Sequence, residues 1–165
     1  MPVKYEQVVF CQPSELQTSL YRLFISSPEI KKLLRGVGSQ PLKAINILKK
    51  LCNHPELLDL PNDLHGSDDL IPEGFVGATP DGSVPYTGRR QERRYLNCEW
   101  SGKFAVLERF LHKIRTETND KIVLISNYTQ TLELFERLCR DKGYVYSCRW
   151  KLAVAHTPQI WLLPP

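Results

Sequence analysis

The first third of the chain begins with a β-like run and continues with an amphipathic helical pattern. Residues 5–11 are rich in residues that favour extended structure, and they predict a short strand. Ser14 and Gln17 have the spacing of a capping box, which predicts that a helix begins directly after Ser14. The apolar residues that follow recur at helical spacing and predict one buried face, made of Leu16, Leu20, Leu23 and Phe24.

A second amphipathic helix is predicted after the glycine-containing break at residues 36–40. Pro41 fits the first turn of a helix, where its missing N–H has no partner to lose. His54-Pro55 ends the pattern, because the proline ring disfavours the α conformation for the residue before it. The predicted buried face consists of Leu42, Ile45, Leu48, Leu51 and Cys52, with Lys43, Lys49 and Lys50 off it.

Residues 59–99 show little hydrophobic periodicity and contain five glycines and four prolines. An irregular segment of this length is unusual inside a compact domain, so we predict a linker or an insertion between two folded parts.

Charge is distributed unevenly along the chain. Residues 51–88 contain seven acidic and no basic residues, whereas the rest holds all 22 Lys and Arg and 11 of the 18 acidic residues. This basic remainder suits a polyanionic partner, although a solvated surface would carry the same charge.

Residues 100–143 predict a helix, a buried strand and a second helix. Ser101 is the expected N-cap of the first helix, and Gly143 stands where a glycine commonly ends the second. The short apolar run 121–125 predicts a strand covered on both faces. The helices have apolar stripes, made of Phe104, Leu107, Phe110, Leu111 and Ile114 in the first and of Leu132, Phe135, Leu138 and Cys139 in the second. This order opens a parallel α/β layer, but one strand cannot make a sheet, so the unit is predicted to be incomplete.

The sequence offers no catalytic centre. Phosphoryl transfer needs a phosphate cradle and an acid for Mg²⁺, and neither a Gly-x-x-x-x-Gly-Lys-Ser/Thr loop nor an Asp-Glu pair occurs. The five cysteines form no Cys-x-x-Cys pair, and the four histidines are isolated from one another. We therefore predict no catalytic residues, no metal site and no cofactor for this segment.

Membrane association is not expected either. No apolar run reaches the ~18 residues that a membrane-spanning helix needs. The first residues lack the apolar stretch of a signal peptide. Together with the cysteine pattern, these features predict an intracellular protein with free thiols.

The best candidate for ligand binding is the polar stretch between the predicted strand and the last helix. It would lie at the carboxyl end of the strand, which is the edge where open α/β sheets bind ligands. The free N–H groups and positive end of the following helix favour phosphate there, and Ser126, Asn127 and Thr129 add neutral donors. The alternative is that Asn127 or Thr129 only caps the helix.

Two sets of basic residues are further candidates for contacts with a phosphate backbone. Lys103 falls in the first turn of a helix, where a cation opposes the helix dipole. It could be kept there for phosphate or for a contact between lobes, and an ordinary exposed lysine is the alternative. The cluster Arg89, Arg90, Arg93 and Arg94 could neutralise phosphates and make binding depend on salt. It could equally pair with the acidic stretch before it or lie in a solvated loop.

Three motifs, in this order and at this spacing, resemble one family. They are Leu-Lys-Lys-Leu-Cys-Asn-His-Pro-Glu-Leu-Leu at 48–58, Ser-Gly-Lys-Phe at 101–104, and Lys-Ile-Val-Leu-Ile-Ser-Asn-Tyr-Thr-Gln-Thr-Leu at 121–132. They resemble the Swi/Snf-type DNA translocases, motor ATPases of the helicase superfamily, and most closely the Rad-fifty-four-like branch of homologous-recombination repair. The resemblance covers residues 1–143. It begins after the family's ATP-binding motifs and stops before its last catalytic ones.

The resemblance implies a fold, an activity and partners. The fold class is α/β: an incomplete piece of a two-lobed RecA-like helicase motor, mostly helical, with few short strands and a long irregular linker. The intact relative is expected to be a DNA-dependent ATPase that uses ATP and Mg²⁺ and moves on double-stranded DNA. It is expected to work in the nucleus with a RecA-type recombinase filament. In the family, the motif at Ser126, Asn127 and Thr129 grips the DNA sugar-phosphate backbone.

The resemblance also divides the chain. Residues 1–58 correspond to the end of the first motor lobe plus a helical insertion, residues 59–99 to the interlobe linker and insertion, and residues 100–143 to the start of the second RecA-like lobe. Residues 144–165 depart from the family, because they contain no Asp-Gly turn and no acidic residue. We interpret them as an unrelated tail that is either mistranslated from non-coding sequence or disordered. Downstream genomic DNA that encodes no Asp-Gly turn would contradict the first of these explanations.

Two other classes remain open from the sequence. The first is a non-catalytic helical interaction module, in which residues 14–58 dock on a partner. The second is a fragment of a chromatin remodeller from the same superfamily. An interaction module predicts binding that depends little on salt, whereas a DNA-gripping segment predicts affinity that falls steeply with salt. Because two half-domains would expose sheet edges and apolar faces, we also expect poor solubility of the isolated chain.

Overall fold

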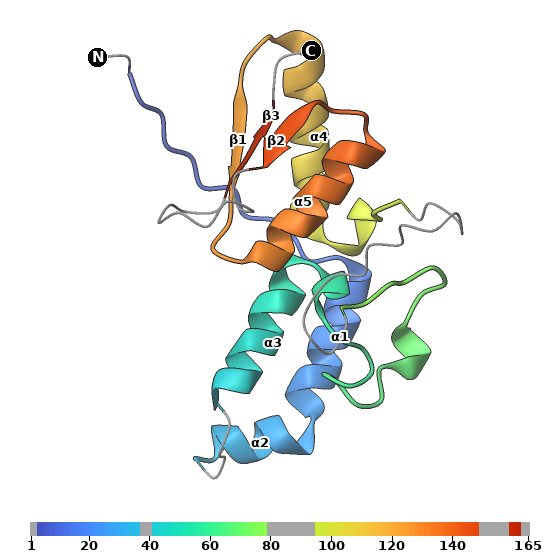
Figure 1. Ribbon diagram of the computed structural model, residues 1–165. Coiled ribbons are helices and arrows are strands. Elements are labelled where there is room, and N and C mark those ends of the chain that lie inside the picture. The colour runs from blue at the N-terminus through green and yellow to red at the C-terminus, as the bar shows by residue number, and fades with distance from the viewer. Residues whose placement is uncertain (1–2, 37–40, 79–94, 149–158, 163–165) are drawn as a thin grey trace.

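The computed structural model describes residues 3–36, 41–78, 95–148 and 159–162, and it combines helices with one small sheet (Figure 1). The helices are α1 (Glu15–Ser26), α2 (Pro28–Leu34), α3 (Pro41–Asn53), α4 (Gly102–Glu117) and α5 (Thr129–Asp141). The strands are β1 (Ile122–Ile125), β2 (Tyr146–Cys148) and β3 (Gln159–Leu162). Single 3₁₀ turns lie in the connections: η1 (Pro55–Leu57), η2 (Asp68–Leu70) and η3 (Cys98–Trp100). In Figure 1, α1–α3 form the lower half, and the sheet with α4 and α5 forms the upper half.

The start of α1 confirms the sequence prediction. The Ser14 hydroxyl oxygen accepts a hydrogen bond from the Gln17 backbone N–H at 3.1 Å, and the Gln17 side-chain oxygen accepts one from the Ser14 N–H at 3.1 Å. These two bonds complete the capping box. Leu20 and Phe24 are buried on the predicted face. They belong to the helical cluster, which consists of Leu20, Phe24, Ile47, Leu51, Leu58 and Leu64.

The buried face predicted for α3 is wrong in part. Leu42 and Ile45 are 74% and 46% exposed, and Cys52 is exposed as well. The helix instead places Ile47 and Leu51 in the helical cluster. Apolar residues surround much of this helix, so periodicity alone could not select the face that packs against α1.

The strand predicted at residues 5–11 does not form. The segment 3–14 has no regular secondary structure, and Val8 and Phe10 are 82% and 94% exposed. A strand needs a neighbouring edge to complete its hydrogen bonds, and none of the described strands pairs with this segment. Strand propensity could not supply that edge.

The sheet is antiparallel, in the order β1-β3-β2, with Ile122 opposite Leu162 and Cys148 opposite Ile160. The predicted opening of a parallel layer is therefore wrong for the described strands. The expectation of a disordered tail at 144–165 is also wrong for its described residues, since β2 and β3 come from it. The first correction arises because β1 pairs with β3, a strand that was not predicted. Burial explains the second, because Ile160 and Leu162 are 0% and 1% exposed and complete an apolar core.

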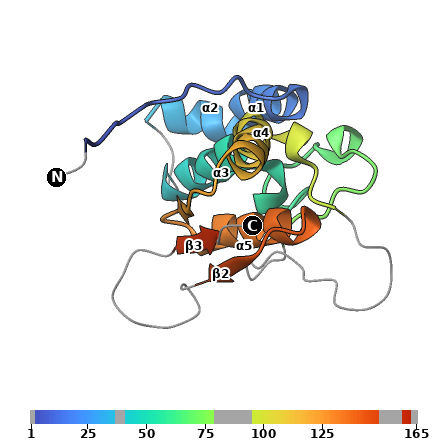
Figure 2. The ribbon, with the colours of Figure 1, turned by 90° about the horizontal axis from the view of Figure 1, so that it is seen from above.

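That second core is the sheet cluster. From above, α5 lies beside β2 and β3 (Figure 2). β1 is covered less than predicted, because Leu124 is buried but Ile125 is 59% exposed. The cluster consists of Leu57, Leu96, Cys98, Phe104, Leu111, Leu124, Leu132, Leu134, Leu138, Cys139, Ile160 and Leu162.

The segment 59–78 consists of turns and one 3₁₀ turn, but it packs closely against the helices. Leu64 is buried in the helical cluster. The Ala78 N–H donates to the Leu58 carbonyl at 3.0 Å, and Ala78 is itself buried. The described part of this irregular segment is thus fixed to the end of the α3 region.

The connector His54–Leu58 links the two halves of the structure. α3 ends at Asn53, and His54 is extended, which confirms the predicted stop before proline. His54 is fully buried, its Nδ1 accepts from the Glu56 N–H at 3.2 Å, and its Nε2 donates to the Asn97 carbonyl at 3.1 Å. The two leucines that follow enter different cores, Leu57 the sheet cluster and Leu58 the helical cluster.

The start of α4 is hydrogen-bonded to α1 and α3. Ser101 caps α4, as predicted, and its hydroxyl donates to the Asn53 carbonyl at 2.6 Å. The Gln17 side chain donates to the Leu51 carbonyl at 2.7 Å and accepts from the Gly102 N–H at 3.0 Å. These bonds, like the connector, join the helical half to the sheet half.

We expect Gly102→Ala to lower the free energy of unfolding by about 1–3 kcal/mol, as overpacking typically does. A Cβ at this position would lie 1.8 Å from the backbone oxygen of Gln12. This clash outweighs the ~1 kcal/mol by which alanine favours a helix over glycine. Urea denaturation measures the change, with Arg109→Ala on the exposed side of α4 as control. Unchanged stability of the glycine variant would contradict the close approach.

We expect the His54 ring to stay neutral in the folded chain until the pH falls to about 4. Burial lowers the pKa of His54 to about 4, against the raising effect of its bond to Asn97. The unfolded chain binds this proton near pH 6.5, so the stabilisation is complete above 6.5 and is lost between 6.5 and about 4. The loss amounts to ~3 kcal/mol. Ring-carbon NMR shifts report the titration, and urea denaturation at pH 7 and 5 reports the stability.

The control for this titration is His54→Gln, which removes the proton-binding group. Burial raises the pKa of the neighbouring Glu56 carboxyl. That effect favours the folded state as pH falls and partly offsets the histidine. The variant should therefore lose less stability between pH 7 and 5 than the parent chain does. A His54 ring that titrates near 6.5 in the folded protein would show that the burial is wrong.

Candidate nucleic-acid interface

The loop between β1 and α5 holds the three predicted contact residues close together. Ser126 is half-buried, whereas Asn127 and Thr129 are exposed. The Ser126 hydroxyl oxygen accepts a hydrogen bond from the Tyr128 N–H at 3.1 Å, which tightens the turn and leaves the hydroxyl proton to donate elsewhere. In Figure 1 this loop lies at the end of the sheet nearer to α1–α3.

The N-cap of α5 is Tyr128, and no side chain caps the helix. The alternative in which Asn127 or Thr129 serves as the cap is therefore wrong. The first turn also carries no acidic residue, so the positive end of the helix keeps its attraction for an anion. The exposed amide of Asn127 and the hydroxyl of Thr129 stand beside that end. The arrangement can donate neutral hydrogen bonds to phosphate oxygens.

Lys103 makes a contact between the two halves of the structure. Its Nζ donates to the Asn53 side-chain oxygen at 2.9 Å, which joins the first turn of α4 to the end of α3. The side chain thus joins the helical half to the sheet half, and the predicted contact between lobes stays a prediction. A contact with DNA through this exposed side chain stays a prediction.

The arginine cluster predicted from the sequence, Arg89, Arg90, Arg93 and Arg94, lies outside the described residues. Its role in DNA binding therefore stays a prediction. In the described ranges, no three His, Cys, Asp or Glu side chains are placed to hold a metal ion. No described helix is long and apolar enough to cross a bilayer.

A buried ion pair holds α5 against the connector. Arg137 Nη1 lies 2.8 Å from a carboxylate oxygen of Glu56, whose side chain is 1% exposed. Burial raises the pKa of Glu56, and the nearby Arg137 opposes that shift. The sequence pattern did not predict this pair. The available signal was an acidic residue inside the apolar run Pro55–Leu58, because a charge that is buried there needs a partner.

Comparison with known proteins identifies related sequences. No family model matches the chain. The sequence is 58% identical over 144 residues to the DNA repair protein rhp54 of Schizosaccharomyces pombe. It is 51% identical over 145 residues to the DNA repair and recombination protein RAD54 of Saccharomyces cerevisiae. It is 43% identical over 150 residues to the DNA repair and recombination protein RAD54-like of Homo sapiens.

These matches cover 87–88% of this chain but only 15–18% of each relative. The chain thus spans about a sixth of the length of the relatives it matches. The predicted resemblance to Rad-fifty-four-like repair proteins is confirmed, since these relatives are repair or recombination proteins by name. This chain is therefore a RAD54-like sequence, homologous to one segment of the RAD54 DNA repair and recombination proteins.

Proposed function

We propose that the chain is the hinge segment of a double-stranded DNA translocase that acts in homologous-recombination repair. In this proposal, residues 1–58 end the first lobe of a two-lobed RecA-like motor and add a helical insertion. Residues 59–99 connect the lobes, and residues 100–143 begin the second lobe. The supporting observation is the identity of 43–58% with RAD54 proteins. The connector and the bonds around Ser101 would then join the two lobes.

The contribution of this segment to the motor is a grip on the DNA backbone. The loop between β1 and α5 is exposed, and α5 begins without a side-chain cap. Ser126, Asn127 and Thr129 would donate to phosphate oxygens, which positions a duplex without reading its sequence. The Arg89–Arg94 cluster would add a salt-dependent attraction.

The ATP site of this motor is proposed to lie outside the chain. The sequence contains no phosphate-binding Gly-x-x-x-x-Gly-Lys loop, so the residues present do not fit ATP and Mg²⁺. From the similarity to RAD54 proteins we also propose a RecA-type recombinase filament as a partner and a nuclear location.

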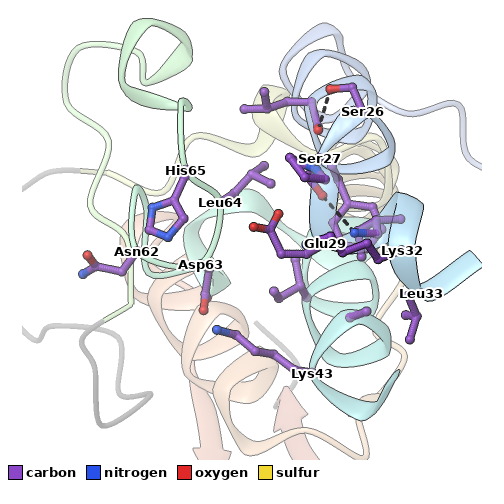
Figure 3. Close-up of a pocket in the computed structure, with 16 residues that line it drawn as sticks. Ser26, Ser27, Glu29, Lys32, Leu33, Lys43, Asn62, Asp63, Leu64 and His65 are labelled. Atoms are coloured by element: carbon purple, nitrogen blue, oxygen red, sulfur yellow. Dashed lines mark hydrogen bonds between the residues drawn. The ribbon is translucent and has the colours of Figure 1, made fainter. Parts of the chain in front are cut away.

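A helical interaction module is the second candidate, and a cavity favours it. The cavity measures about 760 Å³ and lies between α1, α2, α3 and residues 62–65 (Figure 3). Its wall includes Phe24 and Ile47, and Glu29, Lys43 and Asp63 stand around it. Such a module would bind its partner with little dependence on salt. A grip on DNA would give a slope of log K against log salt of about −0.9 for each neutralised phosphate.

Alanine at Ser126, Asn127 and Thr129 together is expected to weaken duplex binding at least about tenfold. Each lost hydrogen bond to phosphate should contribute about 1 kcal/mol. Alanine at Ser126 also removes the bond that its hydroxyl accepts from the Tyr128 N–H. Fluorescence anisotropy with two labelled duplexes of unrelated sequence, at fixed ionic strength, measures the affinity. Thr116→Ala is the control, because Thr116 is exposed near the far end of β1. Equal affinities for the triple variant and the parent chain would exclude this loop as the grip.

The purified chain is expected to hydrolyse no ATP, with or without duplex DNA and Mg²⁺. The reason is the missing phosphate cradle, which this segment cannot replace. A coupled assay of ADP release measures turnover. DNA-stimulated hydrolysis that persists through repeated purification would contradict the assignment of the ATP site to another part of the motor.

A further inference from the structure

We propose that the Glu56–Arg137 ion pair is a clamp that sets the direction of α5 and so presents the Ser126–Thr129 loop to DNA. The inference rests on the proposed function and adds the residues that orient its site. Neither residue is proposed to touch the DNA, so both are positioning residues.

The carboxylate of Glu56 joins three segments that are far apart in the sequence. It lies in η1 of the connector, and Arg137 of α5 bonds to it at 2.8 Å. It also accepts a hydrogen bond from the backbone N–H of Val76, in the irregular segment. The nearby Asp141 carboxylate, also in α5, acts on Glu56 with a like charge. One buried oxygen pair therefore links α5, the connector and residue 76.

Because the Glu56–Arg137 ion pair is buried, it is sensitive to the orientation of α5. Glu56 is 1% and Arg137 16% exposed, so water cannot readily replace either partner. A buried ion pair is a weak source of stability compared with apolar packing, but breaking it leaves an uncompensated charge. A rotation or slide of α5 would separate the guanidinium from the carboxylate and is therefore opposed. Apolar contacts of α5 in the sheet cluster are non-directional and do not resist such a slide as strictly.

The clamp acts at a distance from the loop. Arg137 is eight residues after Thr129, which corresponds to about 12 Å along the helix. The amino end of α5 has no side-chain cap, so its orientation depends on how the body of the helix is held. A small change in helix direction at Arg137 is transmitted to Asn127 and Thr129 through the rigid helix.

The test is a double-mutant cycle with Glu56→Gln, Arg137→Gln and the double variant. Each single variant is expected to lower duplex affinity about fivefold or more, measured well below its melting temperature. The double variant is expected to be no weaker than the weaker single variant, because the pair acts as a unit. Glu117→Gln and Lys113→Gln remove the exposed pair on α4 and should each change affinity less than twofold.

Amide NMR of the DNA-free chain supplies the second measurement. The expected result is that Glu56→Gln shifts the amide signals of residues 126–130, and that the control variants leave them unchanged. Arg137→Lys, which keeps the charge, should shift them less than Arg137→Gln. If the parent chain binds no DNA but Glu56→Gln still shifts these signals, the proposed function fails and the clamp stands. Lower thermal stability with unchanged loop signals and unchanged affinity would overturn the clamp.

Discussion

The packing of this structure depends on the corner at His54-Pro55. The proline stops α3, the buried histidine ring fixes the turn through two hydrogen bonds, and a single 3₁₀ turn follows over Pro55–Leu57. Leu57 ends the 3₁₀ turn and Leu58 begins the extended chain after it, and the two leucines enter two separate cores. Without that corner, the helical half and the sheet half would share no common apolar segment. The polar bonds around Ser101 and Gln17 reinforce a junction that the corner creates.

The features that were predictable from the sequence were those that depend on local chemistry. The capping box at Ser14, the cap at Ser101 and the stop at His54 involve residues a few positions apart, and all three are present. The errors concern partners that are distant in sequence. The run at 5–11 has β propensity but no edge to pair with, and α3 could bury either of two apolar faces. The antiparallel pairing of β1 depends on residues more than 30 positions later, which no local pattern in β1 could reveal.

The candidate site shows the same division. The position of Ser126, Asn127 and Thr129 between a strand and a helix followed from the alternation of apolar and polar residues. The identity of the cap did not, because Tyr128 occupies it without a side-chain bond. Glu56 and Arg137 are 81 positions apart, and only the fold brings them together. The polar residues of the loop were thus predictable from local sequence, whereas the ion pair that holds α5 was not.

The central position of β3 has a consequence for synthesis of the protein. Both neighbours of this strand precede it in the chain, and each pairs with β3 rather than with the other. A ribosome therefore releases β1 and β2 before the strand that joins them exists. Until residues 159–162 emerge, β3 does not cover the apolar surfaces of α5 and β1. The edges of β1 and β2 that pair with β3 are then exposed in the nascent chain. This half of the molecule is committed to folding late, whereas the α1–α3 half can assemble while translation continues.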